Sequence, residues 1–157
     1  MKKEKIQKHY LFEGLGMPIM LLNVPMKEIF GEWVLDIDLN KFQKSLLEFL
    51  TQKPTPLSGP ELRFIRKYLG MTTTEFGKII GMTHSGVIKY ESCQSRLNPA
   101  TEAYIRLYVF DHLNKKRDSE FRKLYHNIDI DSLKRHRRDK DVCKPMEINA
   151  EDFMKAC

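Results

Sequence analysis

The run from Thr72 to Glu91 constrains the fold of this chain more than any other segment, because it has the pattern of two short helices joined by a glycine turn. Gly77 offers a small residue where two helices that cross at a wide angle would touch, and Gly81 tolerates a positive φ at the turn. Apolar residues recur at a spacing that would place them on the concave side of the pair. They are Phe76, Ile80, Met82, Val87 and Tyr90. The segment therefore predicts a helix-turn-helix.

Two threonines mark the predicted helix starts independently of the apolar pattern. Thr73 and Thr83 stand where an N-cap hydroxyl would accept a hydrogen bond from the first turn of each helix. Two helices joined by a turn in this way are typical of proteins that bind DNA, and the alternative is an ordinary helical hairpin inside a globular core. Agreement between the caps, the glycines and the apolar residues favours the DNA-binding interpretation.

The outer face of the second predicted helix is the candidate surface for reading DNA, because a helix of this kind enters the major groove. The candidate base-contacting residues are His84, Ser85, Ile88 and Lys89. Phosphates are expected at helix N-termini, where free amides and the helix dipole converge. The candidate phosphate-contacting residues are Thr73, Thr74, Arg96, Asn98 and Thr101.

The flanking segments extend the motif to a four-helix domain. Residues 58–70 predict a helix with Pro60 near its first turn and Gly70 at its end, and residues 101–114 predict another. The region from Leu57 to Leu113 resembles the Cro/repressor type of helix-turn-helix domain, which implies a dimer on an inverted repeat of double-stranded DNA. The last helix carries more apolar residues than one core face would use, and the surplus predicts a dimer interface. Its candidate residues are Tyr104, Tyr108 and Phe110.

The N-terminal third predicts short strands over residues 18–25, 26–30 and 33–37, separated by proline and by Gly31-Glu32. Asp38 then caps a predicted helix, and residues 53–56 form a stiff proline hinge. The apolar positions of that helix are Leu39, Phe42, Leu46, Leu47 and Leu50. The expected fold is therefore α+β: a small N-terminal β-hairpin or meander with a helix, then a mostly helical domain, then a helical basic extension. The expected boundaries are 1–53, 54–57, 58–114 and 115–157.

A second resemblance covers about Tyr10 to Leu113 and is to the MqsA family of type II antitoxins. The residues that carry it are 9–15, 21–25, Gly31-Glu32, the Lys53-Pro54 hinge and 57–67. The resemblance implies an N-terminal domain that neutralises a toxin, usually an RNase, and a C-terminal domain that dimerises and represses the operon. Family members generally carry C-x-x-C pairs for zinc, whereas residues 27–31 stand where a pair would be.

From that difference we expect no metal, and a hairpin held by apolar packing with Phe30 and Trp33 as anchors. The segment from Ile19 to Leu22 is the expected toxin-binding site, because it would offer an exposed strand edge and a Met-rich apolar face. Cys93, Cys143 and Cys157 form an odd set without C-x-x-C spacing, so we expect free thiols in a reducing compartment.

The charge balance fits a polyanionic partner. The chain of 157 residues has a formal net charge of +6 and a pI near 9.2, and most of the excess lies between Lys115 and Lys140. The segment 134–138 is either a phosphate-tracking arm or a solvated helix face. No apolar run approaches membrane-spanning length and no apolar signal core follows the N-terminal lysines, so we expect a cytoplasmic protein.

No catalytic constellation is visible in the sequence, so we expect no enzyme and no cofactor. The histidines are scattered outside metal-ligand spacings, and no serine or cysteine stands in a nucleophile context. The five histidines are His9, His84, His112, His126 and His136. Three hypotheses remain: an autorepressing antitoxin with a toxin partner, a stand-alone transcriptional regulator of the Cro/repressor type, and an interaction protein that no longer binds DNA.

Overall fold

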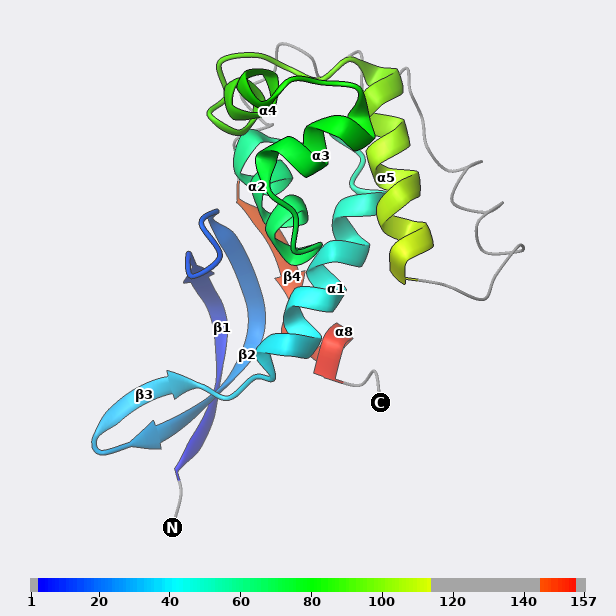
Figure 1. Ribbon diagram of the computed structural model, residues 1–157. Helices are drawn as coiled ribbons and strands as arrows, with labels where there is room; N and C mark the ends of the chain where they lie inside the picture. The colour runs from blue at the N-terminus through cyan, green and yellow to red at the C-terminus, as the bar shows by residue number, and fades with distance from the viewer. Residues whose placement is uncertain (1–2, 114–144, 155–157) are drawn as a thin grey trace. The chain divides into compact units, whose positions relative to one another are not determined.

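The structure is a computed structural model that describes residues 3–113 and 145–154. Within these residues it is an α+β protein with an N-terminal strand meander and six helices (Figure 1). The chain divides into two compact units, with unit 1 made of Met1–Ser45 and Lys144–Cys157, and unit 2 of Leu46–Cys143. None of the helices in the described part of the chain is long and apolar enough to cross a membrane.

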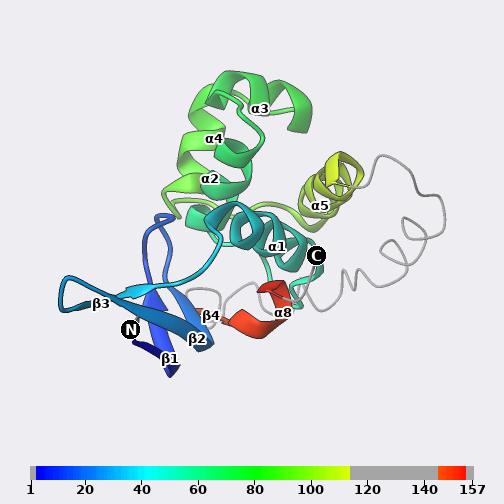
Figure 2. The ribbon, with the colours of Figure 1, turned by 90° about the horizontal axis from the view of Figure 1, so that it is seen from below.

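Unit 1 is built on a sheet in which β2 (Ile19–Ile29) is the central strand. It pairs antiparallel with β1 (Glu4–Phe12) and with β3 (Glu32–Leu35), and parallel with β4 (Met146–Asn149). The contacts with β3 and β4 fall on different parts of β2, since β3 pairs with residues 26–29 and β4 with residues 19–22. Figure 2 shows this sheet from below, with β4 leading into the short helix α8 (Ala150–Met154).

Two expectations for these strands are wrong. The Lys-rich segment that forms β1 was not expected to be a strand, and β2 continues through Pro25 instead of ending there. The carbonyl of Pro25 accepts a hydrogen bond from the backbone N–H of Asp36 at 2.9 Å, so the N–H that proline lacks would point to the same side of β2. On that side of β2, Pro25 lies between residues 26–29, which pair with β3, and residues 19–22, which pair with β4. Proline is therefore tolerated inside this strand.

The turn between β2 and β3 lies one residue earlier than expected. Phe30 and Gly31 both have positive φ, of 50° and 85°, and Ile29 pairs directly with Glu32. This is the pattern of a two-residue type I′ hairpin turn. Phe30 is fully exposed at the turn, and Trp33 is 37% exposed with the ammonium of Lys5 4.2 Å from its ring centroid. The prediction that Phe30 anchors the hairpin is therefore wrong, whereas Trp33 is partly covered and contacts Lys5 of β1.

The core of unit 1 is closed by the C-terminal segment. The ring of Phe42, on α1 (Leu39–Gln52), meets Phe12 edge to face at 5.4 Å and Phe153 of α8 at 5.2 Å. Ile148 and Ala150 are also buried. The other buried apolar residues of the sheet side are Met17, Ile19, Leu21, Val24 and Met26. The division thus differs from the expected boundaries, because residues 146–154 belong to the same unit as the N-terminal strands.

Unit 2 contains four further helices, which are α2 (Gly59–Tyr68), α3 (Thr73–Ile80), α4 (His84–Glu91) and α5 (Pro99–Leu113). Helix α5 begins two residues before the expected start, because Asn98 caps it by accepting a hydrogen bond from the N–H of Thr101 at 2.8 Å. The core is apolar and includes the second half of α1. Its buried side chains are Leu46, Leu47, Leu50, Leu62, Phe64, Ile65, Phe76, Val87, Ile105, Val109 and Phe110.

The expected hinge is fastened within unit 2. The guanidinium of Arg106 on α5 donates to the carbonyls of Thr51 at 3.3 Å, of Lys53, and of Thr55 at 2.8 Å. It also pairs with Glu102 at 2.7 Å, and the same carboxylate accepts the backbone N–H of Leu57 at 2.9 Å. The contact-based boundary between the units falls inside α1, after Ser45. The Lys-Pro segment is therefore part of unit 2 and not a free joint.

Candidate nucleic-acid interface

Local hydrogen bonds define where α3 and α4 begin. The Thr72 hydroxyl accepts the N–H of Glu75 at 3.2 Å, and the Glu75 carboxylate accepts the N–H of Thr72 at 2.7 Å, which makes a capping box. The expected cap at Thr73 is thus one residue too late. The expected cap at Thr83 is confirmed, since its hydroxyl accepts the N–H of Gly86 at 3.1 Å. The hydrogen bond from the Thr72 backbone lowers the pKa of the Glu75 carboxyl.

Glycines allow the two helices to approach and turn. Gly81 ends α3 in the left-handed conformation, with φ of 70°, as the sequence predicts. A Cβ on Gly77 would lie 2.5 Å from the Met82 carbonyl oxygen, so a small residue is required here, although the closest backbone contact is with the turn and not with α4 itself. Sequence reasoning missed Gly59, where a Cβ would lie 2.5 Å from the carbonyl oxygens of both Tyr90 and Glu91. The start of α2 therefore abuts the end of α4.

An ion pair fixes the C-terminal end of α4. The Arg66 guanidinium of α2 contacts the buried carboxylate of Glu91 through two hydrogen bonds, at 2.6 and 3.0 Å, and donates to the Met71 carbonyl at 2.9 Å. Arg63 reaches the same carboxylate at 3.3 Å. The hydrogen bond to Glu91 raises the pKa of Arg66. This set was not predicted, because nothing in the local pattern says which arginine of α2 meets a glutamate so far along the chain.

The outer face of α4 carries the predicted base-contacting residues. His84, Ser85, Ile88 and Lys89 are all exposed, whereas Phe76 and Val87 on the concave side are buried. Ile80, Met82 and Tyr90 are half-buried. The structure thus places all four candidates on the exposed side of one helix.

A direct contact joins the first residues of α3 and α4. The hydroxyl oxygen of Thr73 lies 2.6 Å from Nδ1 of His84. Because Nδ1 is engaged within the chain, Nε2 of His84 is the ring nitrogen left for an outside group. The sequence placed Thr73 among phosphate contacts and His84 among base contacts, and gave no sign that the two side chains meet.

The remaining phosphate candidates lie in two places. Thr74 is exposed in the first turn of α3, and Arg96 is exposed in the loop before α5. Asn98 and Thr101 are engaged with each other in the cap of α5. These are the two helix starts to which the sequence assigns the candidates, with Arg96, Asn98 and Thr101 near the start of α5.

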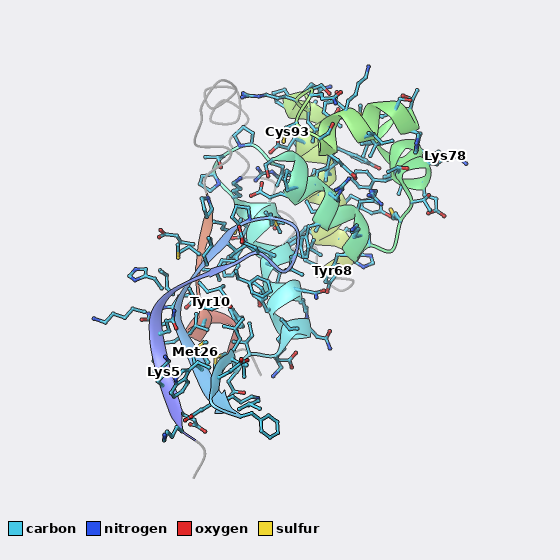
Figure 3. All side chains as sticks on the ribbon, turned by 90° about the vertical axis from the view of Figure 1, so that its left-hand side faces the viewer. Lys5, Tyr10, Met26, Tyr68, Lys78 and Cys93 are labelled. Atoms are coloured by element: carbon cyan, nitrogen blue, oxygen red, sulfur yellow. The ribbon has the colours of Figure 1, made fainter. Side chains whose placement is uncertain are left out.

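In the described part of unit 2, three glutamates are buried and most of the basic residues are exposed, and Glu48, Glu75 and Asp111 are exposed as well. The buried carboxylates of Glu61, Glu91 and Glu102 are paired with cations of the same unit. The exposed basic residues are Arg63, Lys67, Lys78, Lys89 and Arg96, and Figure 3 shows Lys78 on the outer side of α3. The described surface of this unit therefore carries more exposed basic residues than exposed carboxylates.

The candidate dimer residues differ in exposure. Tyr104 is 48% exposed and Tyr108 is half-buried, and their rings lie 6.5 Å apart on α5. Phe110 is only 8% exposed. Its side chain belongs to the core of unit 2, so it offers little surface to another chain.

The expected toxin-binding edge is absent. Ile19 and Leu21 are completely buried, and residues 19–22 of β2 pair with β1 on one side and β4 on the other. The expectation of an exposed edge at Ile19–Leu22 is therefore wrong, because the C-terminal strand covers it.

No group of three or more metal-binding side chains occurs among residues 3–113 and 145–154. Cys93 is exposed as a free thiol in that part of the chain. Cys143, Cys157, His126, His136 and the basic segment 134–138 lie outside the described residues. Comparisons of the chain with protein-family models, with curated proteins and with solved structures find no match.

Proposed function

We propose that the chain is a sequence-specific DNA-binding antitoxin of a type II toxin-antitoxin system, which acts in the cytoplasm as a dimer, neutralises a toxin and represses its own operon. The observation that carries the DNA-binding part is the exposed row His84, Ser85, Ile88 and Lys89 on α4. The Thr83 cap fixes the start of this helix, and the Arg66–Glu91 ion pair fixes its end. The antitoxin part rests on the resemblance to the MqsA family. In this proposal α2 to α5 have the Cro/repressor arrangement.

In this proposal α4 lies in the major groove with its N-terminal turn against the bases. His84 presents Nε2, Ser85 its hydroxyl, and Ile88 an apolar surface suited to a thymine methyl group. Lys89 then contacts a guanine or a phosphate. The Thr73 contact at 2.6 Å supports a role for His84, since a side chain held in one orientation discriminates better than a free one.

Phosphates are bound around the rim of this surface. Thr73 and Thr74 lie in the first turn of α3, where backbone N–H groups face outward, and Arg96 adds an exposed guanidinium. The exposed cations of unit 2 supply the sequence-independent part of the affinity.

The homodimer would form through α5 and bind an inverted repeat with half-sites roughly 34 Å apart. Tyr104 and Tyr108 are the residues that we assign to this interface, because both leave aromatic surface uncovered in the chain. Aromatic rings are enriched in such contacts.

The experiment that tests the proposal uses the full chain in two assays. Footprinting on the DNA upstream of its gene should reveal a protected inverted repeat, with affinity that falls as salt rises. Co-expression with the adjacent reading frame should relieve growth inhibition by that protein. A matched pair of variants sharpens the first assay: Lys89→Ala should weaken operator binding more than Lys67→Ala, which removes the same charge from α2. Equal binding to operator and unrelated DNA would refute sequence-specific reading, and failure to relieve toxicity would leave a stand-alone regulator.

A further inference from the structure

The turn at the end of the β2–β3 hairpin breaks a local rule. A type I′ turn needs positive φ at both central positions, for which Asn-Gly is favoured, yet the first position is Phe30 at φ of 50°. A bulky residue in the left-handed region is strained, and strained residues of this kind cluster at functional sites. The aromatic ring is also fully exposed, so the fold of unit 1 gains no burial from it.

Two more apolar side chains lie near this ring, on opposite faces of the hairpin, since Ile29 pairs with Glu32 and Trp33 pairs with Glu28. Ile29 is 41% exposed immediately before the turn, and Trp33 is partly exposed just after it. We call Ile29, Phe30 and Trp33 the hairpin tip. Figure 1 shows the β2–β3 turn at the free end of this arm of the sheet, and Figure 3 shows Lys5 on β1 near the same arm. A projecting ring with apolar neighbours is suited to entering a pocket on a partner, where aromatic anchors dominate binding energy.

The charge of the hairpin indicates the kind of partner. Residues 27–36 contain one lysine and three carboxylates, Glu28, Glu32 and Asp36, for a net charge of −2 in a chain of net charge +6. Lys27 is paired with Asp36 at 2.7 Å, and Glu28 is paired with Lys3 of β1 at 3.4 Å, so Glu32 is the carboxylate that remains to give the turn its charge. Residues 29–35 contain Glu32 and no basic residue, so the turn itself is acidic, which disfavours nucleic acid and complements a basic protein. Proteins that act on nucleic acid carry such basic surfaces.

Strand addition at the neighbouring edge is disfavoured. Among the described residues β1 is an edge strand, and it carries Lys5 and Lys8, which oppose pairing with another chain. The turn itself contains no lysine, although Lys5 of β1 lies 4.2 Å from the ring centroid of Trp33.

We propose that the hairpin tip is the surface by which unit 1 binds the toxin, with Phe30 inserted into an apolar pocket that basic residues surround. This inference rests on the proposed antitoxin function and names the surface that performs it. Glu32, beside the turn, lies against the basic rim of the pocket.

The test is the variant Phe30→Asn in the full chain, with the purified product of the adjacent gene as the probe. Asn-Gly is the favoured type I′ pair, so this variant should melt at the same temperature as the parent or higher. Its affinity for the probe should fall about 30-fold or more, as expected for loss of an aromatic anchor. Leu39→Ala, which removes an exposed apolar side chain at the start of α1, should leave the affinity unchanged.

The charge argument has its own pair of variants. Glu32→Lys should weaken binding of the probe most at low salt, whereas Glu13→Lys, in the exposed loop after β1, should have a smaller effect. Parent-like affinity of Phe30→Asn for the probe would overturn the inference and leave the antitoxin function intact. Loss of operator binding, or a change of the chain's own oligomeric state, in Phe30→Asn would show that the tip meets DNA or a second copy, and would also overturn it. If the parent chain itself fails to bind the probe, the antitoxin function and this inference both fall.

Discussion

The α3–α4 pair and the sheet of unit 1 are specified in different ways. In the helix pair, each start is set by a threonine that bonds a residue three positions later, and the turn is set by one glycine with positive φ. In the sheet, the central strand pairs at residues 19–22 with a strand that follows more than a hundred residues later. The comparison teaches that the starts of α3 and α4 and the turn between them are encoded locally, whereas the sheet depends on distant contacts.

The largest expected effect concerns where the two units separate. A chain that starts at Thr55 would lose Leu46, Leu47 and Leu50, which are all fully buried in unit 2. Large buried aliphatic residues contribute roughly 2–5 kcal/mol each, so this chain should fail to fold and to bind the operator. A chain that starts at Asp38 keeps α1 whole and should retain operator binding. Circular dichroism measures the folding of each truncated chain, and footprinting measures its operator binding. A folded chain from Thr55 would place the boundary between the two units at the Lys-Pro hinge.

The next effect tests the fastening of the Lys-Pro segment. Arg106→Ala leaves the Glu102 carboxylate buried without its cation and frees the carbonyls of Thr51 and Thr55. Loss of one partner of a buried pair typically costs about 3–5 kcal/mol, so the free energy of unfolding measured in urea should fall by that amount. Arg63→Ala, at a largely exposed guanidinium, should cost about 1 kcal/mol or less. Equal losses in the two variants would contradict a structural role for the Arg106 contacts.

A third effect tests whether the C-terminal segment belongs to the sheet. Phe153→Ala should destabilise unit 1 by about 3 kcal/mol, because the ring is buried against Phe42. Amide exchange should then quicken in β2, near Ile19 and Leu21, and remain slow in α4. Met154→Ala, at an exposed neighbour, is the control. Unchanged exchange in β2 after loss of the ring would contradict the placement of α8.

The difference between local and distant contacts explains which features of the fold could be predicted from the sequence. Gly81, Thr83 and Pro60 were predicted because each acts within its own turn. Strand β1 was missed, since its lysines obscure the alternation, and β2 was cut at Pro25 because its partners were unknown. The Arg106 contacts could not be foreseen, because they join residues that are about fifty positions apart only after folding.

In the candidate site, too, local features could be predicted from the sequence and contacts between helices could not. Exposure of His84, Ser85, Ile88 and Lys89 was predictable from helical spacing. The Thr73–His84 contact was not, because it depends on how α3 and α4 cross. The burial of Phe110 was likewise hidden, since the sequence shows a surplus of apolar residues on α5 without showing which of them the core takes.

A fourth prediction separates base reading from phosphate binding. Ser85→Ala and His84→Ala should each cost roughly 1–3 kcal/mol on the operator and relax preference at one or two positions. Arg96→Ala should weaken all sequences alike and reduce the salt slope by about one. Thr73→Val should reproduce part of the His84→Ala effect, because it removes the hydroxyl that holds the imidazole. Selection from a random-sequence DNA library measures these preferences, and unchanged preference in both α4 variants would sink the assignment.

The smallest expected effect concerns the cap of α3 and its dependence on pH. The Glu75 carboxyl has a pKa below its ordinary value of 4.5, mainly because it accepts the N–H of Thr72. A lowered folded pKa means that the unfolded chain binds more protons, so the contribution to stability is present above the ordinary value and is lost as the pH falls through the folded value. Glu75→Gln should therefore flatten the stability profile slightly between about pH 5 and pH 3 relative to the parent. Glu48→Gln, at an exposed carboxyl of α1, is the control, and parallel profiles for Glu75→Gln and the parent would show that the capping box does not persist in solution.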